Sequence, residues 1–164
     1  MASTGESSST RKWRFDVFLS FTGEDTRLNF TDHIHAALKK RGFIVFRDTE
    51  GIEKGQAIKQ QLLKAIEDSL YSIIILCENY AFSTWCLDEL QKILEASENL
   101  GRQVFPIFYD VDPSDVRKHR KSFEEALAKH DETFKHSNDK DKVQRWRDAL
   151  TQVANISGWD SRGR

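Results

Sequence analysis

The chain has 164 residues, with 25 Lys and Arg against 26 Asp and Glu, and its formal net charge is −1. This length predicts one domain whose core needs no disulfide or metal to hold it. The balanced charge gives no general attraction to nucleic acid or to anionic membranes, and no apolar run is long enough to span a bilayer. The two cysteines form no disulfide framework and indicate a reducing compartment.

The two ends of the chain differ in composition from its middle. Residues 1–12 begin MASTGESSST, a polar, Ser-rich stretch without the apolar core of a signal peptide. We expect this segment to be a disordered tail. Residues 13–160 then form the folded domain, and residues 161–164 are expected to be a truncated linker to further domains.

Apolar runs alternate with helical patterns along the domain. Four runs predict strands, at 15–21, 43–46, 72–77 and 104–109. Apolar residues spaced three or four apart predict helices, at 30–38, 58–66, 86–94, 122–130 and 143–153. This alternation predicts an α/β, flavodoxin-like, three-layer fold: a central parallel sheet of about five strands in the order 2-1-3-4-5, flanked by helices.

Single residues predict where some elements end. Gly42 follows Lys39, Lys40 and Arg41 and is expected to end the first helix. Residues 122–125, SFEE, have the spacing of a capping box. Pro106 cannot donate to a sheet ladder, so it predicts a sheet edge or a bulge.

Ligands bind such sheets beyond the carboxyl ends of the strands, at the point where the strand order reverses. Here that point lies between the first and third strands, where the loops 22–27 and 78–83 meet. The stretch FSTWCLDEL, residues 82–90, begins in the second loop, and Ser83 is expected to cap the helix that follows.

Helical spacing separates the two acids of this stretch. Asp88 faces a solvated surface, whereas Glu89 has Trp85, Cys86 and Ile93 as neighbours and lies at the margin of the buried face. A carboxylate beside an aromatic wall suits a reaction that develops positive charge, such as cleavage of a glycosidic bond. Spacing alone favours the simpler interpretation, in which Glu89 is a boundary residue that pairs with Lys92 or with water.

Other chemistry has little support in the sequence. A dinucleotide fingerprint and a P-loop are both missing. The five histidines show no metal-ligand spacing, so we expect no metal site. Ser20 reads as a turn hydroxyl, and Cys86 reads as a small core residue.

Five stretches in order resemble the plant-type Toll/interleukin receptor (TIR) domain, which is found at the N-terminus of nucleotide-binding leucine-rich-repeat (NLR) immune receptors. They are FDVFLSFTGEDTR at 15–27, FRDTEGIEKGQAI at 46–58, YAFSTWCLDEL at 80–90, VFPIFYDVDPSDVR at 104–117 and RWRDALTQVANISGW at 145–159. The resemblance implies a cytoplasmic or nucleo-cytoplasmic disease-resistance receptor, with nucleotide-binding and leucine-rich-repeat domains downstream.

The resemblance also implies an activity. Plant TIR domains of this kind cleave NAD+ or NADP+ as a substrate, need no other cofactor, and release nicotinamide with ADP-ribose-type products that signal cell death. The family's catalytic glutamate falls on Glu89. The residues implied to line the substrate site are Phe21, Thr22, Gly23, Ile52, Ser83 and Trp85, with Ile52 in a loop at 48–55 that gates the pocket.

Self-association is the further property that the resemblance implies. Asp32 and His33 of the first helix, and Gly158 with the last helix, would form the contacts. The sequence departs from the family pattern at Thr22, usually Arg, at Asp32, often Ser, and at Ile52, commonly Leu. The competing interpretation is a non-catalytic module for TIR–TIR interaction. A flavodoxin-like receiver or flavin binder ranks below both, because the 22–27 loop is acidic.

Overall fold

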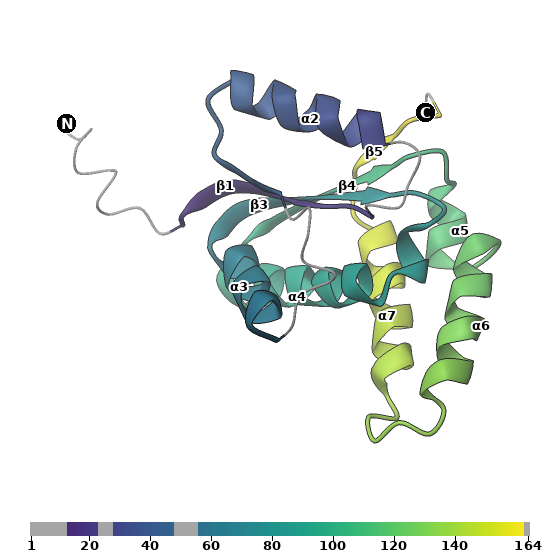
Figure 1. Ribbon diagram of the computed structural model, residues 1–164. Helices are drawn as coiled ribbons and strands as arrows, with labels where there is room; N and C mark the ends of the chain where they lie inside the picture. The colour runs from purple at the N-terminus through teal and green to yellow at the C-terminus, as the bar shows by residue number, and fades with distance from the viewer. Residues whose placement is uncertain (1–12, 23–27, 48–55, 163–164) are drawn as a thin grey trace.

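The computed structural model describes residues 13–22, 28–47 and 56–162, and Figure 1 shows them as a central sheet with helices on both faces. The strands are β1 (Phe15–Ser20), β2 (Val45–Arg47), β3 (Ser69–Leu76), β4 (Gln103–Phe108) and β5 (Trp159–Asp160). The helices are α2 (Leu28–Lys40), α3 (Gln56–Glu67), α4 (Thr84–Leu100), α5 (Pro113–Arg117), α6 (Ser122–Phe134) and α7 (Lys142–Ala154), with a 3-10 helix, η2 (Tyr80–Phe82). The tail predicted at 1–12 lies outside the described residues.

The strands pair in parallel in the order β2-β1-β3-β4-β5, which confirms the predicted order. In Figure 1, α2 lies on one face of the sheet, and α3, α4 and α7 lie on the other. On the α2 face, Tyr71 of β3 and Phe105 of β4 are 42% and 43% exposed. The main core therefore lies on the opposite face, between the sheet and the three helices.

The predicted apolar faces of α3, α4 and α7 contribute to this core, whereas Ala37 on the predicted face of α2 is exposed. Trp146 of α7 is the largest of the fully buried side chains. Burying one large apolar side chain contributes about 1.5–3 kcal/mol, so the periodic positions stabilise the packing of each helix on the sheet. The buried positions include Leu62, Ala65 and Ile66 of α3, Cys86, Leu90, Ile93 and Leu94 of α4, and Val143, Trp146, Leu150 and Val153 of α7.

Two predicted helix ends have different outcomes. Gly42 has φ 93° and its N–H bonds the Lys39 carbonyl at 2.9 Å, which confirms the predicted end of α2. The predicted capping box is wrong, because the N-cap of α6 is Lys121, at φ 56°. Ser122 therefore lies in the first turn of α6 and not at the capping position.

Pro106 does not mark the edge of the sheet. β4 lies between β3 and β5, and Pro106 is aligned with Ile74 of β3. The outer strand β5 is only two residues long and pairs with β4 from Ile107 and Trp159 onward. Pro106 thus precedes the outer ladder, which explains why a proline is tolerated in this strand.

Candidate active site

The predicted site lies where the carboxyl ends of β1 and β3 meet the start of α4. The sequence places Ser83 at the N-cap of α4, and the structure confirms it: the side chain of Ser83 accepts a 3.0 Å hydrogen bond from the Cys86 N–H. Ser83 has φ −90° and ψ 113°, the extended conformation that N-cap residues adopt. This cap fixes where α4 begins, and so it fixes the direction of every side chain in its first two turns.

Glu89 is buried more deeply than helical spacing indicated. The prediction placed it at the margin of the apolar face, but its residue surface is only 4% exposed. Lys92, the partner in the simpler interpretation, lies with its Nζ 2.6 Å from Glu67 of α3. Lys92 thus ties α4 to α3, and this engagement removes the main support for Glu89 as a boundary residue paired with Lys92.

Asp88 has a structural partner. Its Oδ1 accepts a 3.2 Å hydrogen bond from Nε1 of the buried Trp146. Asp88 is half-buried, so the prediction of a solvated surface is wrong here. The two neighbouring acids therefore face different elements, with Asp88 directed to α7 and Glu89 to the sheet.

Glu89 is held from β1. The hydroxyl of Ser20 donates a 2.7 Å hydrogen bond to Glu89 Oε1 and lies 2.8 Å from the hydroxyl of Tyr80. Interpreting Ser20 as a turn hydroxyl is therefore wrong, and Tyr80 was not predicted. The alternation of the strand contains one signal for Ser20. Phe18 and Ser20 share the strand face opposite to that of Val17, and this face points toward α4.

Phe21 and Thr22 line a cavity on the α2 side of the strand ends. The cavity is small, with a volume of about 10 Å³, and Phe30 and Thr31 of α2 and Tyr109 form much of the rest of its wall. Glu89 does not belong to the set of described residues that line this cavity. The Cys86 thiol, 3.4 Å from the Phe21 carbonyl, connects the two sides of the predicted site.

The other predicted substrate residues divide into two groups. Trp85 is partly buried and packs against the core at the same end of α4 as Ser83. Gly23 and Ile52 lie outside the described residues, as does the predicted gating loop 48–55. Ser83 is the N-cap of α4, and Trp85 and Glu89 lie in its first two turns.

The residues predicted for self-association belong to two segments, α2 and the chain just before β5. Asp32 forms an ion pair with Arg47, 2.6 Å from NH2 to Oδ1, so its charge is not isolated, and the neighbouring His33 is exposed. Gly158 does not belong to the last helix, because α7 ends at Ala154. A Cβ on Gly158 would lie 2.0 Å from the Pro106 carbonyl oxygen, so this glycine allows β5 to approach β4 closely.

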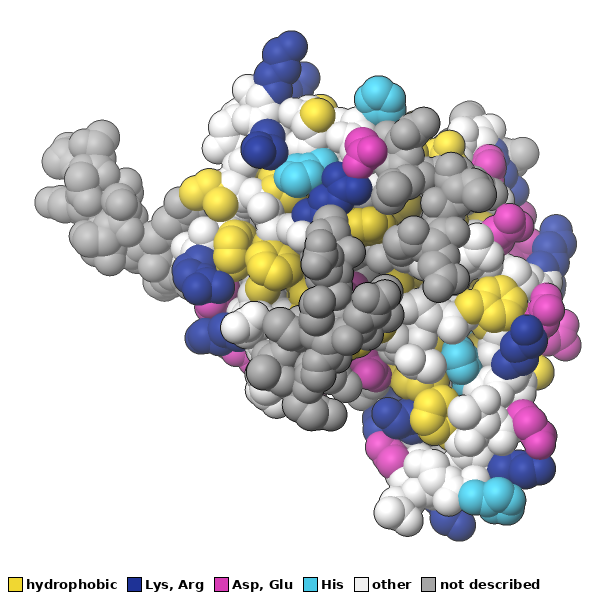
Figure 2. Space-filling model, in the orientation of Figure 1, with side chains coloured by type: hydrophobic (Ala, Val, Ile, Leu, Met, Phe, Trp, Pro, Cys, Tyr) yellow, Lys and Arg dark blue, Asp and Glu magenta, His cyan; other side chains and the backbone are white. Residues whose placement is uncertain are grey.

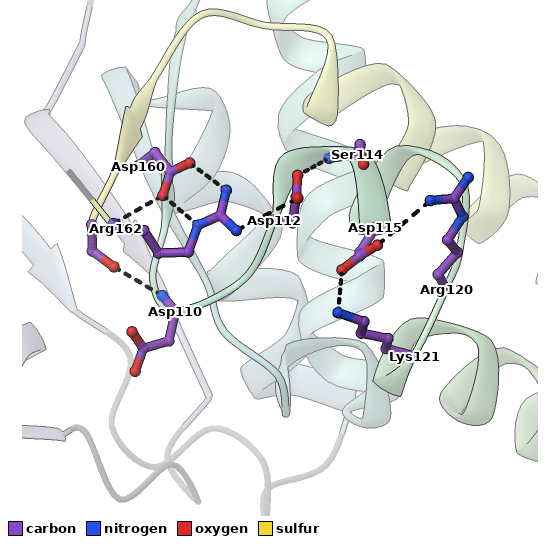
Figure 3. Close-up of polar contacts among 9 residues, drawn as sticks. Asp110, Asp112, Ser114, Asp115, Arg120, Lys121, Asp160 and Arg162 are labelled. Atoms are coloured by element: carbon purple, nitrogen blue, oxygen red, sulfur yellow. Dashed lines mark hydrogen bonds and ion pairs between the residues drawn. The ribbon is translucent and has the colours of Figure 1, made fainter. Parts of the chain in front are cut away.

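A network of charged side chains links the segment after β5 to the loop before α5 (Figure 3). Arg162 Nε and NH2 bond the carboxylate of Asp160 at 3.0 and 2.8 Å, and NH1 lies 3.5 Å from Asp112. Asp112 also caps α5, and the backbone hydrogen bond from Ser114 holds the pKa of its carboxyl below the ordinary value. The predicted linker began at residue 161, yet the Ser161 N–H bonds the Phe108 carbonyl at 2.9 Å. The described fold thus continues through Arg162.

Charges elsewhere are mixed. Figure 2 shows basic and acidic side chains interspersed over the face in view. Across the residues that the structure describes, no three His, Cys, Asp or Glu side chains form a group that could hold a metal ion. In the same part of the chain, no helix is both long and apolar enough to cross a bilayer.

Comparison with known proteins identifies the family. A family model described as the TIR domain matches residues 14–163. Disease resistance protein RPV1 of Vitis rotundifolia is 56% identical over 158 residues, which is 96% of this chain but 11% of that protein. TMV resistance protein N of Nicotiana glutinosa is 47% identical over 152 residues, which is 93% of this chain and 13% of that protein.

A solved structure gives the same result. The TIR domains in the structure of the activated Roq1 resistosome, which directly recognises the pathogen effector XopQ, match with a TM-score of 0.81 at 48% identity. The match covers 91% of this chain and 89% of that chain, and it confirms the predicted flavodoxin-like TIR fold. The chain therefore belongs to the TIR domain family, as a plant-type domain homologous to those of disease resistance proteins.

Proposed function

We propose that this domain is an NAD+ glycohydrolase of a plant immune receptor, active on self-association, with Glu89 as its catalytic residue. The observation that carries the proposal is the burial of Glu89, a residue only 4% exposed, whose carboxylate accepts a hydrogen bond from Ser20 at the carboxyl ends of the strands. Burying a carboxylate is costly. A module that needs only its surface for interaction gains nothing from burying a carboxylate. The burial of Glu89 therefore favours the enzyme over the non-catalytic alternative.

The proposed reaction breaks the bond between ribose C1′ and the nicotinamide nitrogen. The bonding electron pair leaves with the nitrogen, which becomes neutral, so the leaving group needs no proton. The positive charge that develops at the ribose is stabilised by the Glu89 carboxylate, which contacts the ribose hydroxyls. Water then adds to C1′ and loses a proton, which gives ADP-ribose, or a nucleophile of the product itself closes a ring.

The remaining residues are proposed to bind the substrate, and the part of the substrate that each would contact is inferred from its position in the fold. Ser83 and Trp85, at the start of α4, would lie against the nicotinamide ribose. Phe21 and Thr22, which follow β1 in the chain, would face the nucleotide together with Gly23. Ile52 is proposed to contact the substrate from the gating loop. NAD+ and NADP+ are both candidate substrates, and no other cofactor is proposed.

The proposed setting is a longer receptor. RPV1 and TMV resistance protein N are several times longer than this chain, which supports nucleotide-binding and leucine-rich-repeat domains as partners in the same polypeptide. Cys77 and Cys86 are buried thiols that are not joined in a disulfide, which supports a cytoplasmic or nucleo-cytoplasmic location. Self-association is proposed through the α2 surface at Asp32 and His33 and through the segment around Gly158.

The test is release of nicotinamide from NAD+ by the concentrated domain, clustered through a fused oligomeric tag, with cluster size verified by light scattering. Wild type and Asp88→Ala are expected to turn over, and Glu89→Ala is not. Activity should rise with clustering at constant domain concentration. If verified clusters of the wild type release no nicotinamide, the enzyme proposal fails and the domain is an interaction module.

A further inference from the structure

Three side chains from separate elements form a buried chain of hydrogen bonds that ends on Glu89. Tyr80 of η2 donates to the Cys86 carbonyl at 3.1 Å, and its hydroxyl lies 2.8 Å from that of Ser20. Ser20 in turn donates to Glu89 Oε1 at 2.7 Å. The residue surfaces of Ser20 and Tyr80 are both 0% exposed, so protein groups take the place of water around these hydroxyls.

The direction of this chain follows from counting protons. An ionised carboxylate only accepts, and a serine hydroxyl has one proton, which Ser20 gives to Glu89. The oxygen of Ser20 can then only accept from Tyr80. The phenol proton of Tyr80 is thus shared between Ser20 and the Cys86 carbonyl, and the donors run from Tyr80 through Ser20 to Glu89.

Tyr80 keeps its proton. Burial raises the pKa of its phenol well above the ordinary value of 10, and electrostatic interactions with Cys86 and Glu89 raise it further. The hydrogen bond with Ser20 opposes this shift only in part. Tyr80 therefore remains a donor over the whole pH range in which the domain is expected to work.

Rigid backbone holds both hydroxyls in place. Ser20 is the last residue of β1 and is aligned with Ile74 in the parallel pair with β3. The N–H of Tyr80 bonds the Cys77 carbonyl at 3.1 Å, and the Tyr80 carbonyl accepts from the Ser83 N–H at 3.2 Å. Neither hydroxyl can move far without breaking the strand end or the turn that leads into α4.

We propose that Ser20 and Tyr80 are positioning residues, which fix the Glu89 carboxylate in the orientation that stabilises the cationic transition state. This inference rests on the proposed function, and it assigns the two hydroxyls no contact with the substrate. Electrostatic stabilisation is effective when the charged group is held before the reaction and need not reorganise during it. The Ser20 bond fixes one oxygen of the carboxylate relative to the end of β1.

The experiment measures kcat and KM for nicotinamide release by clustered Ser20→Ala, Ser20→Thr and Tyr80→Phe. Ser20→Ala should lower kcat by about ten- to a hundredfold, the effect of losing one hydrogen bond to a charged group, and should change KM by less than about twofold. Ser20→Thr keeps a hydroxyl and should recover most of kcat. Tyr80→Phe should lower kcat by less than Ser20→Ala, because it acts through Ser20.

A buried serine far from Glu89 provides the control. Ser69 is also 0% exposed, and its hydroxyl donates to the Ala65 carbonyl at 2.7 Å, at the opposite end of β3. Ser69→Ala removes a buried hydroxyl bond and should lower the melting temperature without changing kcat. A purely structural role of Ser20 would make the two alanine variants alike in kcat.

The outcomes separate the inference from the proposed function. If wild type turns over, Glu89→Ala does not, and folded Ser20→Ala keeps the wild-type kcat, the positioning role is wrong and the glycohydrolase stands. A rise in KM at constant kcat would also overturn it. If Ser20→Ala does not fold, Tyr80→Phe and Ser20→Thr provide the test. An unchanged kcat in Tyr80→Phe would contradict the proposal. A loss of kcat in Ser20→Thr as large as that in Glu89→Ala would also contradict it. An inactive wild type overturns both.

Discussion

The hydroxyl of Ser20, at the end of β1, donates a 2.7 Å hydrogen bond to a carboxylate oxygen of Glu89, 69 residues further along the chain. This contact joins β1, which lies between β2 and β3 in the sheet, to the second turn of α4. It also distinguishes Glu89 from Asp88, whose Oδ1 accepts from Trp146 of α7 instead. The neighbouring acids should therefore respond differently to substitution.

Asp88→Ala is predicted to lower stability and to leave activity intact. The change leaves the indole N–H of Trp146 without this acceptor, at a cost of about 1–3 kcal/mol in the free energy of unfolding. Asp88→Asn keeps an acceptor oxygen and should cost less. Urea denaturation of the three proteins measures both effects. Equal stability of Asp88→Ala and wild type would show that the Trp146 contact contributes nothing.

Gly158→Ala is predicted to destabilise the isolated monomer. The added methyl group would lie 2.0 Å from the Pro106 carbonyl oxygen, so β5 must shift away from β4. Overpacking of this kind costs about 1–3 kcal/mol. Thermal unfolding at a concentration where wild type is monomeric measures the loss, with the exposed neighbour Ser157→Ala as control. A variant with wild-type monomer stability but weaker self-association would show that Gly158 acts at the interface alone.

The ion pair between Glu67 and Lys92 predicts a pH dependence. The Lys92 hydrogen bond lowers the pKa of Glu67 below its ordinary value of 4.5. Burial acts to lower the pKa of Lys92, but the hydrogen bond and charge of Glu67 outweigh it and raise that pKa above 10.5. The stabilisation by Glu67 is then complete above pH 4.5 and is lost as pH falls through the lowered value. The stabilisation by Lys92 is complete below pH 10.5 and is lost as the pH rises through the raised pKa of Lys92.

Glu67→Gln should accordingly reduce the unfolding free energy most at neutral pH. Glu67 is 37% exposed, so solvent screening limits the loss to at most about 1 kcal/mol. The difference from wild type should shrink as the pH falls below 4.5. Denaturant titrations at pH 7 and pH 3.5 measure it, with Glu95→Gln as the more exposed control. A difference that is the same at both pH values would contradict the assignment.

The sequence predicted the elements that carry a long periodic signal. The runs behind β1, β3 and β4 and the apolar faces of α4 and α7 are extended enough for burial to determine the structure. The two-residue β5 has no such period, and α5 is only five residues long. Both depend on tertiary contacts, such as the close approach of Gly158 to Pro106, which no local pattern reveals.

The site was predictable where it is local. Ser83 and Glu89 belong to one helix, so the cap and the helical spacing placed them correctly relative to each other. The proposal of a catalytic role for Glu89, in place of the boundary interpretation, came from the family resemblance and not from spacing. Ser20 and Tyr80 were missed because their roles depend on distances between β1, η2 and α4, and spacing along the chain contains no information about those distances.

The most direct test of the central claim replaces each acid by its isosteric amide. Nicotinamide release from NAD+ is measured for wild type, Glu89→Gln and Asp88→Asn in clusters of equal, verified size, and circular dichroism confirms that each protein is folded. We predict that Glu89→Gln loses turnover by at least about a hundredfold while Asp88→Asn stays within a few fold of wild type. Turnover by folded Glu89→Gln at the wild-type rate would contradict the claim that this carboxylate carries the reaction.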